Sequence, residues 1–257
     1  MLHTFLKNSV LRGVDANLSE ENPDKIYFNR MVDRIINRVE LMWVSEEIKP
    51  EDKKLMLKLS QSLTLIKKQR VIALFQNRFL NQPEKFERDV LTELYLLSYE
   101  ANMLSPEIQK KLPNRIVEEL YNLGREDVSR TAWLLVATGA DNLETFYRKI
   151  EDIVLGGLAN KGYEVKDVAV IVWALGSTQV TEKMVSSHKL SQPKYQTFWS
   201  HVEEYLFVEL NKQHEKAGEE SVSNVSWVLW AYMNNQELSL KMVDLMSQIL
   251  LETAPKQ

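Results

Sequence analysis

A short segment recurs along the chain, and this repeat constrains the fold more than any other feature. Its copies begin at Asp127, Asp167 and Ser221, and each reads Asp or Ser, Val, four residues, Trp, one residue and Leu. A weaker copy begins at Asp89 and carries Tyr in place of Trp. Successive copies are 38, 40 and 54 residues apart. Periods of roughly 20–50 residues are typical of proteins built from stacked supersecondary units.

A second pattern follows the first in two copies. Residues 145–152 read Thr-Phe-Tyr-Arg-Lys-Ile-Glu-Asp, and residues 197–204 read Thr-Phe-Trp-Ser-His-Val-Glu-Glu. Apolar residues then continue at the spacing of one helix face in both segments. Each repeat is therefore predicted to contain a short first helix and a longer amphipathic second helix. Val168–Trp173 alone is typical of a buried strand, but its aligned copies contain Ala, Ser and Thr, so we predict a helix there too.

Glycine, proline and small polar residues predict where the helices begin and end. A glycine precedes each of the three main copies, and glycine is the usual left-handed residue after a helix. The Asp or Ser that opens each copy is a preferred N-cap. Ser105 is expected to cap a helix that begins at Pro106. Helix or unit boundaries are also expected at the prolines in positions 50, 83, 113 and 193.

The predicted fold class is all-α, an α-solenoid of antiparallel helix pairs with a ~38–40-residue repeat. We expect an N-terminal arm at residues 1–24, basic N-terminal helices at 25–84, and a helical-repeat region at 85–257. An insertion at 177–193 lengthens the last spacing. We expect it to protrude and to contact a partner, as long loops between helices often do.

The net charge of −4 comes from 32 basic and 36 acidic residues, whereas a nucleic-acid-binding domain is usually basic. The charges are uneven, because residues 25–80 hold 12 basic and 6 acidic residues, while 81–160 hold 9 and 14. The helix pair at 51–80 could therefore bind RNA phosphates, or it could be an ordinary solvated surface. The RNA-binding candidates are Lys53, Lys54, Lys67, Lys68, Arg70 and Arg78.

The tryptophans allow two interpretations. One repeat position holds a tryptophan in three copies: Trp133, Trp173 and Trp227. These side chains could form an exposed ladder on which nucleic-acid bases stack. They could instead be buried as wedges between successive helix pairs. A Leu two residues after each of them favours the buried wedge. Trp199 and Trp230 lack counterparts in all copies. They are therefore candidates for partner contacts at the surface, although each could equally be core.

The sequence shows no constellation for catalysis. The absence of cysteine excludes disulfides, thiol catalysis and zinc sites built on thiolates. The four histidines stand in no metal-binding frame, and neither a phosphate-binding loop nor a nucleophile elbow is present. We therefore predict that the protein is not an enzyme and has no catalytic residues, no metal ligands and no cofactor. No apolar run approaches the ~20 residues of a membrane span.

Val172-Trp-Ala-Leu-Gly176 and Val225-Ser-Trp-Val-Leu-Trp-Ala231 resemble the "LLWALAKLG" helix of the octotricopeptide-like repeats and the related FAST-kinase-domain and RAP-domain proteins. The resemblance covers roughly residues 85–252. It implies an organellar helical-repeat protein that acts in mitochondrial or plastid RNA metabolism or in ribosome assembly.

The first 14 residues are amphipathic, contain Lys7 and Arg12, and lack acidic residues. They resemble a mitochondrial transit peptide but fit an ordinary N-terminal arm equally well. We expect a mitochondrial or otherwise cytoplasmic, non-catalytic interaction protein, a scaffold or accessory subunit of a protein or ribonucleoprotein assembly. The alternative is an organellar RNA-binding factor in mitochondrial RNA processing or translation, which would contact RNA through residues 51–80.

Overall fold

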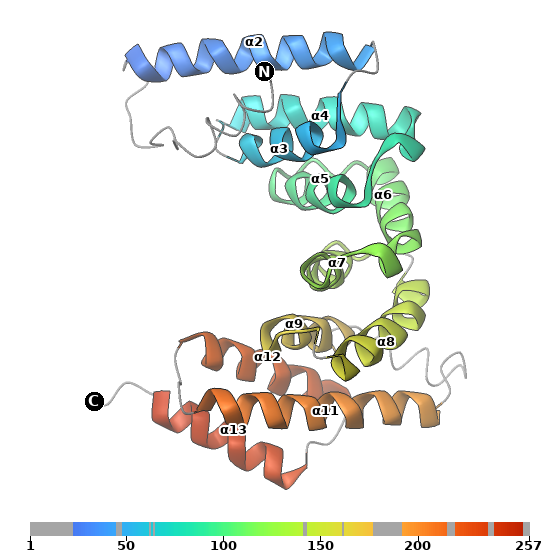
Figure 1. Ribbon diagram of the computed structural model, residues 1–257, viewed down its shortest axis with the longest axis vertical. Helices are drawn as coiled ribbons and strands as arrows, with labels where there is room; N and C mark the ends of the chain where they lie inside the picture. Colours follow the sequence, from blue (N-terminus) through green and yellow to red (C-terminus); the bar gives the residue numbers. More distant parts are fainter. Residues whose placement is uncertain are drawn as a thin grey trace. The chain divides into compact units, whose positions relative to one another are not determined.

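The computed structural model describes residues 23–44, 48–61, 63, 65–140, 143–160, 162–176, 192–214, 219–235 and 239–253. Every regular element in these ranges is helical, which confirms the all-α class (Figure 1). The chain divides into two compact units, Met1–Ile116 and Val117–Gln257. The predicted targeting segment and residues 177–191 of the predicted insertion lie outside the described residues.

The first unit is built from helices on both sides of a short 3-10 turn. Its elements are α2 (Pro23–Val44), α3 (Pro50–Ser60), α4 (Leu65–Asn81), η1 (Pro83–Lys85), α5 (Arg88–Glu100) and most of α6 (Pro106–Glu118). Helix α3 packs on α4 and α5, and α4 also packs on α5 and η1. Leu57, Phe75 and Leu91 are fully buried between these helices. The predicted start of the repeat region at residue 85 lies inside this unit, just before α5.

The second unit carries the three tryptophan-containing copies of the repeat. Its elements are η2 (Leu120–Asn122), α7 (Arg125–Ala137), α8 (Leu143–Ala159), α9 (Val165–Gly176), α11 (Gln192–His214), α12 (Glu219–Asn235) and α13 (Leu240–Thr253). Helix α9 packs on both α7 and α12, so the first helices of the three copies lie side by side. The longer helix α11 packs on α8 and α13. Figure 1 shows both groups of helices.

The β-branched segment 168–173 lies inside α9, as predicted from its aligned copies. Val168, Ala169, Ile171 and Val172 are buried. Packing against neighbours on two sides therefore explains a composition that would otherwise indicate a strand.

The predicted helix starts are wrong by three residues, because the N-caps of α7 and α9 precede Asp127 and Asp167 by that number. Helix α7 begins at Arg125, and its N-cap is Gly124 in an extended conformation with φ −68° and ψ 157°. Helix α9 begins at Val165. Asp127 and Asp167 therefore lie in the first turn, where the helix dipole also favours a carboxylate. Because both positions suit Asp, its presence does not determine which residue is the cap.

Left-handed residues occur instead at the ends of two first helices. Asn102 after α5 has φ 54°, and Gly139 after α7 has φ 63°. The backbone N–H of Met103 donates to the carbonyl of Ser98 at 2.8 Å, and that of Ala140 donates to the carbonyl of Leu135 at 3.0 Å. Both ends therefore have the hydrogen-bond pattern of a Schellman motif.

Most of the predicted proline boundaries are confirmed. Pro50 begins α3, Pro83 begins η1, and Pro106 begins α6 with the Ser105 hydroxyl accepting from the Ile108 N–H at 3.3 Å. Pro113 is the exception, because it lies buried inside α6. There, tertiary packing outweighs the local cost of the missing N–H. No described helix combines the length and the apolar character that a membrane span requires.

Helices α9 and α12 approach each other very closely at Gly176. A Cβ atom on Gly176 would lie 2.6 Å from the Cα of Ala231 and 2.9 Å from its carbonyl oxygen. Both are backbone atoms, so a side chain would fit only if α12 moved. The contact therefore requires glycine.

We predict that Gly176→Ala lowers the free energy of unfolding by about 1–3 kcal/mol, as overpacking of a tight contact does. Urea unfolding followed by circular dichroism measures the change. Gly156→Ala in α8 is the matched control, because its Cβ would meet nothing within 4 Å. The control should keep or gain stability, by up to about 1 kcal/mol, from the better helix propensity of Ala. Equal effects of the two substitutions would contradict the close-contact argument.

Candidate functional site

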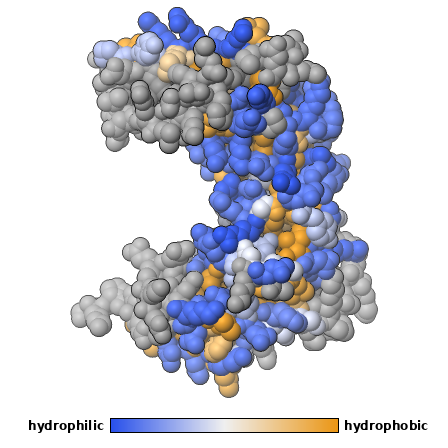
Figure 2. Space-filling model, in the orientation of Figure 1, coloured by the Kyte–Doolittle hydropathy of each residue, from blue (hydrophilic) through white to orange (hydrophobic). Residues whose placement is uncertain are grey.

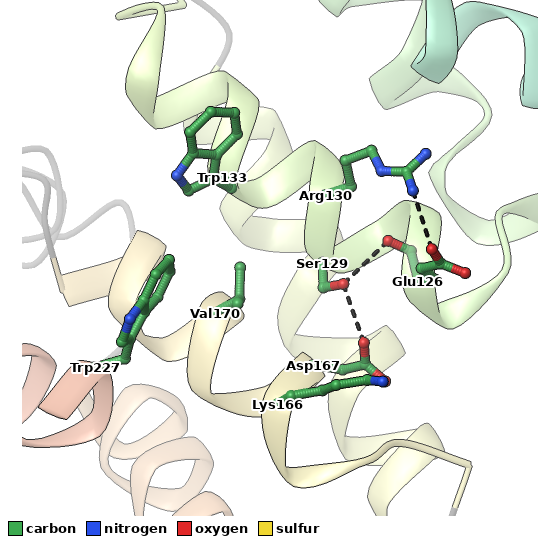
Figure 3. Close-up of a pocket in the computed structure, with 8 residues that line it drawn as sticks. All are labelled: Glu126, Ser129, Arg130, Trp133, Lys166, Asp167, Val170 and Trp227. Atoms are coloured by element: carbon green, nitrogen blue, oxygen red, sulfur yellow. Dashed lines mark hydrogen bonds and ion pairs between the residues drawn. The ribbon is translucent and has the colours of Figure 1, made fainter. Parts of the chain in front are cut away.

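An open groove of about 350 Å³ lies on the second unit, where α7, α9 and α12 meet (Figure 3). We call it the aromatic groove. Its lining residues are Glu126, Ser129, Arg130 and Trp133 of α7, Lys166, Asp167 and Val170 of α9, and Trp227 of α12. Figure 3 shows Trp133 and Trp227 on one side, with the charged side chains gathered on the other.

Helical periodicity explains why these residues share one surface. Glu126, Arg130 and Trp133 follow one another at spacings of four and three residues on α7, which places them on one face. Lys166 and Val170 are four residues apart on α9, so they also share one helix face. Because α9 packs on both α7 and α12, the three faces adjoin.

The aromatic side continues beyond the groove through contacts between indole rings. The ring centroids of Trp173 and Trp227 are 5.0 Å apart, with planes inclined at 54°. Those of Trp173 and Trp230 are 6.2 Å apart, at 40°. Trp133, Trp173 and Trp227 are all partly exposed, so they are not fully buried as the favoured interpretation predicts, although Trp173 and Trp227 do contact each other between α9 and α12. Trp230 is 45% exposed and so lies at the surface, while its role as a partner contact stays a prediction.

Trp199, the other candidate for a partner contact at the surface, is buried instead. Its side chain is only 1% exposed, and its ring packs edge-on against Tyr232 with centroids 5.0 Å apart. The Tyr232 hydroxyl donates to the Trp199 carbonyl at 3.2 Å. Trp199 therefore belongs to the core between α11 and α12 and contributes nothing to a surface.

The cations at the polar side of the groove are paired with carboxylates. An Arg130 nitrogen lies 3.0 Å from Glu126, and another lies 3.7 Å from Asp127. The Lys166 ammonium lies 3.1 Å from Glu164. Hydrogen bonding and charge from Lys166, together with the charge of Arg125, lower the pKa of Glu164, so this carboxylate stays ionised.

Asp167 is buried beneath this polar side and ties α9 to α7. Its carboxylate accepts from the Ser129 hydroxyl at 3.2 Å and from the backbone N–H of Glu164 at 3.3 Å. The Arg125 guanidinium lies 3.8 Å away. Burial, and then the charge of Asp167, raise the pKa of Tyr163 to about 12, so this phenol stays neutral. The site is thus an aromatic surface bounded by internally neutralised charges.

The predicted RNA-binding residues lie in the first unit, and most of them hold neighbouring helices together. Lys53 is only 7% exposed; its ammonium donates to the Lys85 carbonyl at 2.8 Å and lies 3.3 Å from Glu87. The others pair as follows: Lys54 with Asp89 at 3.0 Å, Lys67 with Asp33 at 3.1 Å, Lys68 with Glu100 at 3.1 Å, and Arg70 with Asn37 at 2.7 Å.

These partners are separated by 32 to 35 residues in sequence. That spacing, just below the repeat length, is the signal that could have revealed the pairs beforehand. Arg78 is partly exposed, and within the described ranges its guanidinium has no hydrogen-bond or ion-pair partner. The structure thus leaves Arg78 as the one of the six candidates not already used inside the fold.

No group of three metal-binding side chains occurs among the residues that the structure describes. His201 makes a local contact, with Nδ1 2.7 Å from the Thr197 carbonyl oxygen. The expectations of no cofactor and no catalysis stay predictions. Comparison of the chain with protein-family models, curated proteins and solved structures gave no match. The resemblance to octotricopeptide-like repeats likewise stays a prediction.

We predict that Lys53→Ala lowers the free energy of unfolding by about 1–3 kcal/mol. The substitution removes the ammonium group that donates to the Lys85 carbonyl and pairs with Glu87. Lys58→Ala, at an exposed position of the same helix, is the matched control and should change stability by less than about 0.5 kcal/mol. Urea unfolding measures both variants. A neutral Lys53→Ala would mean that this lysine is available for another role.

Proposed function

We propose that the protein is a non-catalytic helical-repeat interaction protein whose aromatic groove binds an extended segment of a partner protein. The observation that carries this proposal is a set of partly exposed tryptophans on three adjacent helices, beside charges that are already paired. Aromatic residues dominate the binding energy of protein interfaces. A neutral aromatic groove also suits proline-rich extended segments, which dock on aromatic surfaces.

The finer architecture that we propose is an α-solenoid with a repeat of ~38–40 residues. The copies that begin at Asp127, Asp167 and Ser221 lie on α7, α9 and α12, which pack in that order. Each copy contributes a tryptophan from the same repeat position to one surface. Solenoids typically use such a continuous surface of equivalent positions for binding.

A polypeptide explains this site better than RNA does. Unpaired bases also stack on tryptophan, but each phosphate contact needs a cation nearby. Residues 117–257 contain 13 basic and 20 acidic side chains, a net charge of −7. Five of the six cations proposed for RNA contacts have partners within the first unit. We propose, from the family resemblance, that the partner belongs to a mitochondrial protein or ribonucleoprotein assembly.

We predict that Trp230→Ala weakens partner binding by at least about 2 kcal/mol, or roughly 30-fold in Kd, because it removes an exposed aromatic contact. The measurement compares tagged wild-type and variant chains purified from mitochondria, with and without nuclease and at low and high salt. Leu251→Ala is the control, since Leu251 is 76% exposed on α13, away from the groove.

The proposal expects a complex that survives nuclease and high salt, and that is lost in Trp230→Ala but not in Leu251→Ala. Recovery that depends on RNA would favour the alternative RNA-binding function. Absence of the protein from mitochondria would remove the proposed location.

A further inference from the structure

A second groove, of about 480 Å³, lies between α8 and α11 of the second unit. We call it the α8–α11 groove. It is lined by Leu155 and Leu158 of α8, and by His201, Glu204, Tyr205, Val208, Glu209 and Lys212 of α11. It shares no residue with the aromatic groove, so it forms a separate surface.

The floor of the α8–α11 groove is apolar. Val208 is 45% exposed, and Leu155 and Leu158 are partly exposed beside it. The α11 residues that line the groove follow one another at spacings of three, one, three, one and three residues, so they occupy one helix face. This face runs from His201 to Lys212, a length of about 16 Å at the helical rise of ~1.5 Å per residue. A partner helix of three to four turns would match it.

The rim of the groove is acidic. Glu204 is exposed and, in the part of the chain that the structure describes, has no hydrogen-bond or ion-pair partner. Glu209 lies 2.6 Å from Lys212, which neutralises one carboxylate. The Tyr205 hydroxyl donates to the Tyr163 carbonyl, which anchors that ring to the rim. One unpaired carboxylate therefore remains beside the exposed apolar strip.

The second unit as a whole carries a net charge of the same sign. Residues 200–257 hold 4 basic and 9 acidic residues, within a unit of net charge −7. This excess repels polyanions and attracts cationic partners. The visible face of the second unit in Figure 2 is mainly hydrophilic, with hydrophobic residues in narrow strips.

We propose that the α8–α11 groove binds a basic amphipathic helix of a partner protein. Its apolar stripe packs on Leu158 and Val208, and its lysines or arginines face Glu204. Helix-in-groove recognition uses apolar anchors at spacings of three and four residues, which match the lining of α11. The flanking charges set the choice of partner and the rate of association.

The test uses the full chain and three fluorescent peptide probes of about 14 residues, roughly the four helical turns that cover the groove. The first probe is a helix with leucines on one face and lysines on the other. The second carries glutamate in place of lysine, and the third is a scrambled version of the first. Fluorescence anisotropy gives the Kd of each. We expect the basic helix to bind at least about tenfold more tightly than either of the other probes.

Two substitutions in the groove locate the binding. Val208→Lys and Glu204→Lys should each weaken binding of the basic helix by about tenfold, since a close like charge opposes association. Leu251→Lys and Asp244→Lys, at exposed positions on α13, are matched controls for polarity and charge and should leave the Kd unchanged. Circular dichroism and urea unfolding confirm that every variant is folded.

Failure of the basic helix to bind, equal binding of the acidic or scrambled probe, or equal loss in the α13 controls would overturn the proposal. The proposal would also be overturned if an RNA oligonucleotide or anionic vesicles bound more tightly than the basic helix and if Val208→Lys altered that binding. Trp230→Ala removes an indole from the aromatic surface that adjoins the aromatic groove, and it should leave peptide binding unchanged, so the two proposals can fail independently.

Discussion

The close contact between α9 and α12 determines the geometry of the candidate site. The distance between two packed helices depends on the side chains at their contact. Gly176 presents no side chain to Ala231, so the two backbones nearly touch. Trp173 lies three residues before Gly176, and Trp227 lies four residues before Ala231, about one turn along the same interface. The glycine therefore brings together the two indoles whose centroids are 5.0 Å apart, and the aromatic surface depends on this approach.

Charges that look like a binding patch in the sequence act within the fold. Residues 25–80 hold 12 basic and 6 acidic residues, but this count leaves out several of the carboxylates that pair with the basic side chains. Glu87, Asp89 and Glu100 lie beyond that window, but their helices or adjoining turns pack beside α3 and α4. A charge sum over a sequence window treats neighbours in sequence as neighbours in space. In stacked helices, the nearest charges are instead about one repeat away, so the sum mistakes an interhelical network for an exposed patch.

The repeat made the helical fold predictable, including the β-branched segment of α9. The helix starts were not predictable to the residue, because Asp suits both the N-cap and the first turn. The sequence could not decide between an exposed and a buried row of tryptophans, since a repeated aromatic position indicates equivalence but not burial. The sequence leaves Trp199 open between a surface contact and the core, because it lacks counterparts in all copies, and the ring that covers it belongs to Tyr232, 33 residues away on α12. Pairings of this kind appear only once the second helices are placed in space.

The two grooves differ in the chemistry that would select their ligands. The aromatic groove lies on the first helices and has its charges paired, so stacking and apolar contact dominate there. The α8–α11 groove lies on the second helices and keeps the unpaired carboxylate of Glu204 beside an apolar strip. Because no residue lines both, occupation of one surface leaves the side chains of the other in place. A partner that carried both an extended neutral segment and a basic helix would bind the second site at a high effective concentration once the first was engaged. Modest affinity at each groove would then suffice for a stable complex.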